Sequence, residues 1–186
     1  LVTLEPSALA DALGGSLRTR MIGEVFAENA LAAAAGAIAA GVDAAVVARG
    51  IASCPVVPGR FEVVTREPAL VAVDYAHTPD ALARTCDAAR ALAGQKRVIV
   101  VFGAGGGADP EKREPMGRAV GQRADVAIVT NDNPRREDPR FIAKAVARGA
   151  ERGGRAYVLT ELDRRAAIRQ ALERSKPGDV VVVAGK

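Results

Sequence analysis

The sequence predicts an α/β fold in which a mostly parallel sheet carries helices on both faces and is preceded by a helical segment. Beyond residue 59, short apolar runs rich in β-branched residues alternate with stretches of helical periodicity. Before residue 59, strong helix formers dominate. Apolar residues make up 49% of the 186 residues and charged residues 26%, so the chain can bury a core, which excludes disordered and fibrous classes.

The first 58 residues are expected to be helical except near their start. The run EVFAENALAAAAGAIAAG, residues 24–41, consists of helix formers and ends on a glycine, a common helix stop. A shorter helix is expected over residues 43–52. CPVVPG, residues 54–59, suits an extended linker because of its two prolines and its glycine. We therefore predict two parts, residues 1–58 and 59–186.

The second part is expected to alternate six strands with four helices. Most of its apolar runs lack period-two alternation, as in strands buried on both faces of a parallel sheet. Right-handed crossovers then produce a Rossmann-like arrangement. The strands are expected at residues 61–64, 69–74, 97–103, 125–130, 156–160 and 179–185, and the helices at residues 79–94, 115–123, 138–153 and 163–175.

Polar or glycine-rich loops follow four of the predicted strands. In open parallel sheets, ligands bind beyond the carboxyl ends of the strands, so a site is expected in these loops. The loops are DYAHTPD at residues 74–80, GAGGGADPEKREP at 103–115, NDNPRREDP at 131–139, and GK at 185–186.

The loop at residues 74–80 contains a carboxylate and the single histidine of the chain. Asp74 is expected at the end of a buried strand, where an ionised carboxylate is costly unless it binds something such as a ribose hydroxyl or a metal ion. His77 is either a structural residue or a ligand contact. Thr78 and Pro79 fit an ordinary helix start, so capping alone explains part of the motif.

The glycine loop admits two interpretations. GAGGGA satisfies the dinucleotide fingerprint G-x-G-x-x-A, but Pro110 and charged residues follow where a helix should open, which disfavours a nicotinamide or flavin site. The alternative is a flexible loop whose glycines let a ligand or a neighbouring domain approach closely. Lys112 and Arg113 would then offer cations to a phosphate or carboxylate.

The loop NDNPRRED combines turn residues with an arginine. Asp132 and Asn133 suit tight turns, and Pro134 fixes the backbone so that Arg135 projects in a set direction. A guanidinium held in this way can bind a carboxylate through two hydrogen bonds. The alternative is a capped turn that starts the next helix.

Charge, cysteine content and isolated polar residues carry weaker information. The net charge of +4 has no basic block, which disfavours a nucleic-acid or membrane-surface partner. Cys54 and Cys86 match no metal spacing and are too few for disulfide stapling, so a reducing cytoplasm is expected. Each cysteine is expected to be buried. No segment has the pattern of a signal peptide or of a membrane span. Asn29, in the long helix, and Arg60, after the linker, are expected to face solvent unless a ligand meets them.

Taken in order, GEVFAENALAA, VPGRFE, VDYAHTPDAL, VVFGAGGGADPEKREPMG, VTNDNPRREDP and VVVVAGK resemble the Mur ligases of peptidoglycan synthesis, and among them those that add meso-diaminopimelate. The resemblance implies that residues 1–58 end the family's central ATPase domain and that residues 59–186 form its C-terminal domain. It also implies an ATP-dependent amide ligation through an acyl phosphate. The implied substrates are a UDP-muramoyl dipeptide, meso-diaminopimelate and ATP with Mg²⁺. The implied process is cell-wall biogenesis, and with it cell shape and cell division.

The resemblance also implies roles for individual residues. ATP contacts are implied for Asn29 at the adenine and for Arg60, Asp74 and His77 at the base, ribose or phosphates. Contacts to diaminopimelate are implied for Asp132, Asn133, Pro134, Arg135 and Gly185, with Arg135 on the distal carboxylate.

The sequence departs from the family pattern in three places. The family's glycine loop continues Asp-Arg-Asp, whereas this chain has Gly107, Ala108 and Asp109, so one expected carboxylate contact is missing. The chain stops at Lys186, before the family's Gly-His-Glu. It has neither a G-x-x-x-x-G-K-[ST] phosphate loop nor the central-domain lysine that becomes carbamylated.

These departures limit what the chain is expected to do by itself. ATP and Mg²⁺ are expected to be held mainly by the enzyme's own N-terminal and central domains, so we expect the chain to be inactive alone and assign it no catalytic residue and no metal ligand. The alternatives are a divergent paralogue, a folylpolyglutamate-type ligase, against which DNPR speaks, and a dinucleotide-binding oxidoreductase.

Overall fold

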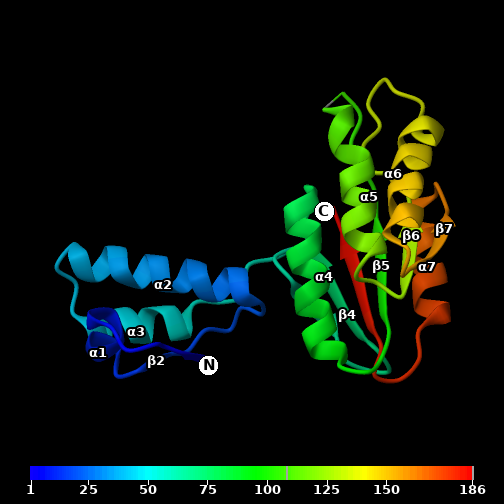
Figure 1. Cartoon of the computed structure of the whole chain (residues 1–186). Coiled ribbons are helices and arrows are strands. Elements are labelled where there is room, and N and C mark those ends of the chain that lie inside the picture. Colours follow the sequence, from blue (N-terminus) through cyan, green and yellow to red (C-terminus); the bar gives the residue numbers. More distant parts are fainter. Residues whose placement is uncertain (108, 186) are drawn as a thin grey trace. The chain divides into compact units, whose positions relative to one another are not determined.

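A computed structural model describes residues 1–107 and 109–185, so that Ala108 and Lys186 lie outside the described residues. The chain forms two compact units, Leu1–Pro58 and Gly59–Lys186 (Figure 1). Each unit is described by itself below.

The first unit is built around three helices. Its elements are β1 (Val2–Thr3), α1 (Ala8–Leu13), β2 (Ser16–Leu17), α2 (Glu24–Ala39) and α3 (Ala44–Ser53), with β1 antiparallel to β2. The Ser7 and Asp43 side chains accept hydrogen bonds from the first turns of α1 and α3. Leu13, Leu17 and Val47 form the core of the unit with Ala34. The helical segment predicted before the sheet is therefore confirmed.

The second unit contains a six-stranded sheet with the order β3-β4-β8-β5-β6-β7. The strands are β3 (Glu62–Thr65), β4 (Leu70–Asp74), β5 (Val98–Phe102), β6 (Val126–Val129), β7 (Tyr157–Thr160) and β8 (Val180–Ala184). All neighbours are parallel except β3, which runs antiparallel to β4 at the edge. The mostly parallel sheet predicted from the apolar runs is confirmed.

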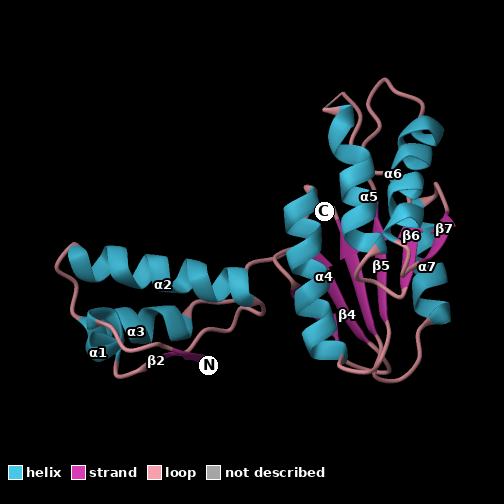
Figure 2. Ribbon diagram, in the orientation of Figure 1, coloured by secondary structure: helices cyan, strands magenta, loops and turns pink. Residues whose placement is uncertain are grey.

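Helices cover both faces of this sheet. They are α4 (Pro79–Ala93), α5 (Arg113–Gly121), preceded by the 3-10 turn Pro110–Lys112, α6 (Pro139–Gly153) and α7 (Arg164–Arg174). Ala167 and Ala171 of α7 pack on Ile99, Ile128 and Val181 on one face. On the other face α4, α5 and α6 lie side by side (Figure 2). Thr78 and Asp138 cap α4 and α6, each followed by proline, as the sequence predicts.

Helices α5 and α6 meet at backbone contact distance. A Cβ atom on Gly117 would lie 1.9 Å from the carbonyl oxygen of Val146, and one on Gly149 would lie 2.1 Å from that of Glu114. Only glycine permits this approach. Because α5 follows the glycine loop and α6 follows the loop at residues 131–138, the contact sets the distance between the two loops.

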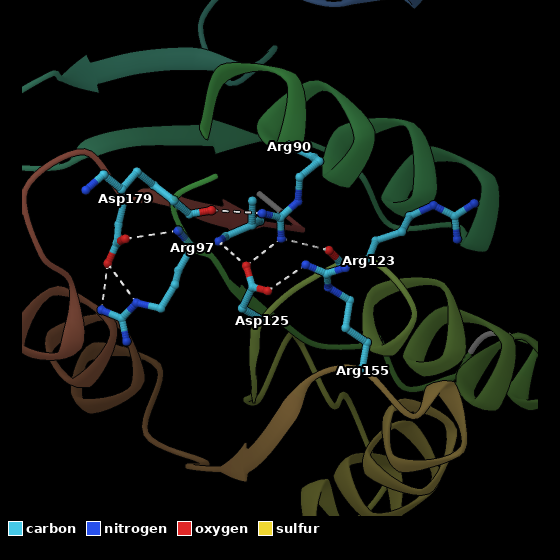
Figure 3. Close-up of polar contacts among 8 residues, drawn as sticks. Arg90, Arg97, Arg123, Asp125, Arg155 and Asp179 are labelled. Atoms are coloured by element: carbon cyan, nitrogen blue, oxygen red, sulfur yellow. Dashed lines mark hydrogen bonds and ion pairs between the residues drawn. The ribbon is translucent and has the colours of Figure 1, made fainter. Parts of the chain in front are cut away.

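An ion-pair network joins the amino ends of the strands (Figure 3). Asp179 accepts hydrogen bonds from the Arg97 guanidinium and backbone, and Asp125 accepts from Arg90 and Arg155. Burial raises the pKa of both carboxyls, but these hydrogen bonds lower it by more, so both pKa values lie below the ordinary value. The network therefore stabilises the edge of the sheet opposite the site loops.

The two cysteines differ from each other in exposure. Cys86 on α4 is fully buried, as expected, and burial, assisted by the charge of Asp87, raises the pKa of its thiol to about 12. Cys54, directly after α3, is exposed, so the prediction that it is buried is wrong. The linker prolines that follow it leave no neighbouring element to cover it.

The described residues include neither a membrane-spanning helix nor a metal-binding cluster. Within residues 1–107 and 109–185, no helix is long and apolar enough to cross a membrane. The same residues contain no group of three or more His, Cys, Asp or Glu side chains that could hold a metal ion.

Candidate functional site

Four loops meet at the carboxyl edge of the sheet because β8 lies between β4 and β5 (Figure 1). Gly185, directly after β8, donates its N–H to the carbonyl oxygen of Asp74 at the end of β4. A Cβ atom on Gly185, which has a φ of 87°, would lie 2.9 Å from Oδ2 of Asp132. The structure thus brings together three predicted site residues from three different loops.

Asp74 is buried with its carboxylate satisfied from within the unit. Its oxygens accept hydrogen bonds from the backbone N–H of Phe61 at 2.7 Å, the N–H of Ala76 at 2.9 Å and the hydroxyl of Thr85 at 2.9 Å. These donors offset the cost of burying the charge, so no ribose or metal ion is required for that purpose. Asp74 holds the turn at Phe61 and the start of the next loop, and its contact with ATP stays a prediction.

Arg60, Tyr75 and His77 form an exposed stack beside Asp74. The Arg60 guanidinium carbon lies 4.6 Å from the centroid of the Tyr75 ring. The Tyr75 and His77 ring centroids are 4.8 Å apart at an interplanar angle of 76°. Nδ1 of His77 lies 2.9 Å from the carbonyl oxygen of Tyr75, a distance at which a protonated Nδ1 donates. The stack presents a cation and aromatic surfaces suited to a nucleotide base or phosphate.

Tyr75 is a member of the stack that the sequence analysis missed. Its signal was available, since an aromatic residue between Asp74 and His77 stands after a strand end in the predicted binding edge. Only the structure shows that Arg60, from the linker end of the unit, packs on it.

The glycine loop and the loop at residues 131–137 are packed together. The N–H of Gly106 donates to the carbonyl oxygen of Asn133 at 3.0 Å, and a Cβ atom on Gly106 would lie 1.9 Å from the carbonyl oxygen of Pro134. The side chain of Arg135 lies over Gly107, with its Cδ 3.1 Å from where a Cβ of that glycine would be. The glycines therefore permit close approach, and the neighbour that approaches is the arginine-bearing loop.

Backbone strain is concentrated beside Pro134. Asn133 and Arg135 have φ values of 31° and 54°, in the left-handed region that side-chain-bearing residues rarely adopt. Both residues are exposed. Such strain persists only where surrounding contacts overdetermine the conformation, which is common at ligand-binding loops.

Arg113 and Glu137 join the same two loops, and the sequence analysis missed their pairing. Arg113 was considered as a cation for a ligand, but it is buried and its Nη2 donates to both carboxylate oxygens of Glu137, at 2.9 and 2.8 Å. Oε1 of Glu137 also accepts from the N–H of Gly107 at 2.6 Å. The hydrogen bond from Gly107 above all, together with those from Arg113, lowers the pKa of the Glu137 carboxyl below its ordinary range.

Arg164, the first residue of α7, connects the ends of β6 and β8. Its guanidinium donates to the carbonyl oxygen of Ala184 at 2.9 Å and to that of Asn131 at 3.5 Å. Burial lowers the pKa of Arg164, and the nearby negative charge of Asp132 acts in the opposite direction. Arg164 thus places a positive charge near the carboxylate of Asp132.

Asn29 belongs to the first unit. It is exposed on α2, whereas the other predicted residues all lie in the second unit. Its contact with adenine stays a prediction.

Comparison with known proteins follows the same division of the chain. Residues 59–186 match the family model described as Mur ligase, glutamate ligase domain. The chain is 45% identical over 172 residues to the UDP-N-acetylmuramoyl-L-alanyl-D-glutamate--2,6-diaminopimelate ligase of Solibacter usitatus, with 92% of the chain covered. It is 47% identical over 161 residues to the protein of the same name from Alkaliphilus metalliredigens, with 86% of the chain covered.

Solved structures agree with these relatives. A structure of a UDP-N-acetylmuramoyl-L-alanyl-D-glutamate--2,6-diaminopimelate ligase has a TM-score of 0.65 at 35% identity, covering 91% of this chain and 34% of that one. Folylpolyglutamate synthase of Mycobacterium tuberculosis has a TM-score of 0.70 at 25% identity, covering 92% of this chain and 40% of that one. The chain spans 34% and 32% of the lengths of the Solibacter and Alkaliphilus relatives.

Proposed function

The chain belongs to the Mur ligase family, and from that membership we propose that it is the C-terminal portion of an ATP-dependent ligase that adds meso-diaminopimelate to UDP-N-acetylmuramoyl-L-alanyl-D-glutamate. The first unit, residues 1–58, is then the end of the central ATPase domain, and residues 59–186 are the C-terminal domain. The complete enzyme acts in the cytoplasm, in peptidoglycan synthesis. The chain alone is inactive because it has no phosphate loop.

The observation that carries this proposal is the exposed Arg135 held over Gly107 by a strained turn at the carboxyl edge of the sheet. A guanidinium placed in this way can form two hydrogen bonds with the distal carboxylate of a diamino diacid. Asp132, beside Gly185, offers a carboxylate for an ammonium group of the same ligand. A ligand that places a carboxylate at Arg135 and an ammonium group at Asp132 satisfies both charges.

The residues at the end of β4 suit the nucleotide. The Arg60 cation and the aromatic surface of Tyr75 fit a base or a phosphate, and His77 adds a second polar contact. When bound, ATP supplies the phosphoryl group that converts the carboxyl of the dipeptide into an acyl phosphate. We assign Mg²⁺ to the upstream domains, since the part of the chain that the structure describes offers no cluster of ligands for it.

This portion of the enzyme contributes binding and orientation. Arg135 holds the diacid by its distal end, so that the amine directed at the acyl phosphate is presented in one orientation, which lowers the entropic cost of the reaction.

The test is the Arg135→Ala variant of the complete ligase, with Arg136→Ala as the matched control, because Arg136 is an exposed neighbour of equal charge. Losing a charged pair with a carboxylate costs about 2 to 4 kcal/mol, or roughly a 30- to 800-fold rise in the KM for diaminopimelate. The KM for ATP should change by less than about twofold. Equal rises for both substrates would contradict the assignment of Arg135.

A second candidate is a relative that takes another amino acid. Gly107 and Ala108 stand where the family resemblance implies an aspartate and an arginine that contacts diaminopimelate, which favours a changed substrate site. Turnover measured with diaminopimelate, lysine and glutamate separates the two candidates, and preference for glutamate would favour the folylpolyglutamate type.

A further inference from the structure

We propose that Arg113 and Glu137 are positioning residues that hold the Arg135-bearing loop against the glycine loop and thereby set the affinity of the enzyme for its diacid substrate. The inference rests on the proposed function and deepens it. Arg113 is buried, and the partly exposed carboxylate of Glu137 accepts hydrogen bonds from Arg113 and Gly107, so their role differs from that of Arg135, which is exposed to a ligand.

The geometry around Glu137 differs from that of a surface ion pair. One carboxylate receives three hydrogen bonds, two from Nη2 of Arg113 and one from the N–H of Gly107 at 2.6 Å. The donors are Nη2 of Arg113, the first residue of α5, and the N–H of Gly107 in the glycine loop. They lie 24 and 30 residues away from Glu137 in sequence. Glu137 therefore ties both the middle of the glycine loop, at Gly107, and its end, at Arg113, to the loop at residues 131–137.

Arg113 is committed to this arrangement by burial. Its side chain is only 8% exposed, and its Nε is one of the buried side-chain atoms of the described residues that have no hydrogen-bond partner. A buried guanidinium with one unpaired donor depends strongly on the partner it does have. Removing the Glu137 carboxylate leaves the cation buried and unpaired, so the start of α5 must shift.

The link from Glu137 to Arg135 is short. The N–H of Glu137 donates to the carbonyl oxygen of Pro134, closing the turn that contains Arg135. The peptide of Gly107 is bound through its N–H to Glu137, while the side chain of Arg135 lies over its Cα. Since Arg135 has an unfavourable φ of 54°, releasing these contacts lets its backbone relax and moves the guanidinium away from its place over the glycine loop.

The effect should be specific to the diacid. Arg60, Tyr75 and His77, the residues suited to the nucleotide, contact one another after the end of β4. The hydrogen bonds of Glu137 with Arg113 and Gly107 instead join the glycine loop to the loop at residues 131–137. A loosened loop therefore changes the binding of the diacid without changing that of ATP.

The experiment measures steady-state kinetics of the complete ligase, with the region upstream of Leu1 restored, for wild type, Glu137→Ala and Glu137→Gln. The matched control is Glu114→Gln. Glu114 pairs with two arginines of α6, Arg148 at 2.9 Å and Arg152 at 2.6 Å. Its side chain is 31% exposed against 40% for Glu137, so it is a carboxylate of similar exposure whose ion pairs are with α6.

We expect Glu137→Ala to raise the KM for diaminopimelate at least tenfold, with the KM for ATP within twofold of wild type and kcat at saturating diacid within threefold. Glu137→Gln should have a smaller effect, because its amide oxygen still accepts from Gly107. Glu114→Gln should leave both KM values unchanged. Amide hydrogen exchange at Gly107 should accelerate in Glu137→Ala only.

Three results would overturn the inference. They are a KM for diaminopimelate within twofold of wild type in Glu137→Ala, an equal rise in both KM values, or an equal effect in Glu114→Gln. Failure of the proposed function gives a different pattern, because the wild-type ligase would then not turn over diaminopimelate at all. Glu137→Ala is expected to fold, since the side chain of Glu137 is 40% exposed.

Discussion

Replacing Asp179 by alanine should destabilise the sheet unit more than any surface charge change of the same kind. Asp179 precedes β8, the central strand between β4 and β5, and its side chain is only 3% exposed. Its carboxylate accepts from the N–H of Arg97 at 3.0 Å and from the Arg97 Nε at 3.1 Å and Nη2 at 2.6 Å (Figure 3). It also accepts from the N–H of Lys176 at 2.9 Å. Alanine leaves all four donors without this acceptor.

The magnitude follows from where water can replace the carboxylate. The Arg97 guanidinium is 37% exposed and also donates to the carbonyl oxygen of Arg174, so its loss is discounted to about 1 kcal/mol. The half-buried N–H of Arg97 costs about 1 to 2 kcal/mol when unpaired, and the exposed N–H of Lys176 costs about 0 to 1 kcal/mol. The free energy of unfolding should therefore fall by about 2 to 4 kcal/mol.

Amide hydrogen exchange of β5 and β8 is the assay, because fully buried central strands exchange through unfolding of the unit. Exchange should accelerate by roughly 30- to 800-fold at neutral pH. The control is Asp87→Ala, which breaks the pair of Arg123 with a carboxylate that is 62% exposed and should cost less than about 1 kcal/mol. An effect of Asp179→Ala no larger than that of Asp87→Ala would refute the reasoning.

The pH dependence gives a second check on the same carboxyl. Burial raises the pKa of Asp179, but the hydrogen bonds from Arg97 and Lys176 lower it by more, so that the pKa lies below its ordinary value of 3.8. A carboxyl whose pKa is lower in the folded state stabilises the fold above its unfolded pKa, and this stabilisation is lost as the pH falls through the folded pKa. The difference in stability between wild type and Asp179→Ala should be constant above about pH 5 and shrink below about pH 4.

Three further predictions test other parts of the structure. Gly117→Ala should lower the free energy of unfolding, measured by thermal unfolding, by about 1 to 3 kcal/mol, because the new Cβ would lie 1.9 Å from a backbone oxygen. The control Gly36→Ala, on an open helix surface, should raise it by about 0.5 to 1 kcal/mol. The same sign for both variants would count against the close packing of Gly117. At pH 8 the native protein should react with one equivalent of thiol reagent, at the exposed Cys54. Cys86 should react only on unfolding, because it is buried and the pKa of its thiol is raised to about 12. Two fast-reacting thiols would contradict the burial of Cys86. Asp74→Asn should destabilise the sheet unit by about 1 to 2 kcal/mol in urea without any nucleotide present, and an unchanged midpoint would mean that its internal hydrogen bonds are dispensable.

Local patterns predicted the elements well. The apolar runs predicted all six strands of the sheet, and Thr78 and Asp138 cap their helices as expected. These features depend on residues within a few positions of one another, through side-chain periodicity, capping and turn geometry. The ordered motifs also indicated the family, because they combine such local signals over most of the chain.

The partners of individual charges could not be predicted in the same way. The chemistry of Arg113 suggested a cation available to a ligand, yet it is buried against Glu137, 24 residues away. The residue type of Cys54 predicted burial, but Cys54 is exposed directly after α3. Which residues meet depends on the path of the chain between them.

The sequence by itself determined the α/β class and predicted a two-part organisation, and its assignment of a site to the loops at the carboxyl edge of the sheet stays a prediction. Only the tertiary structure decided that β8 enters between β4 and β5, bringing Asp74, Gly185 and Asp132 to one edge, and that the glycine loop supports Arg135. The physical reason is that strand order and loop contact are set by packing between distant segments, whereas strand and helix identity are written in the spacing of neighbouring side chains.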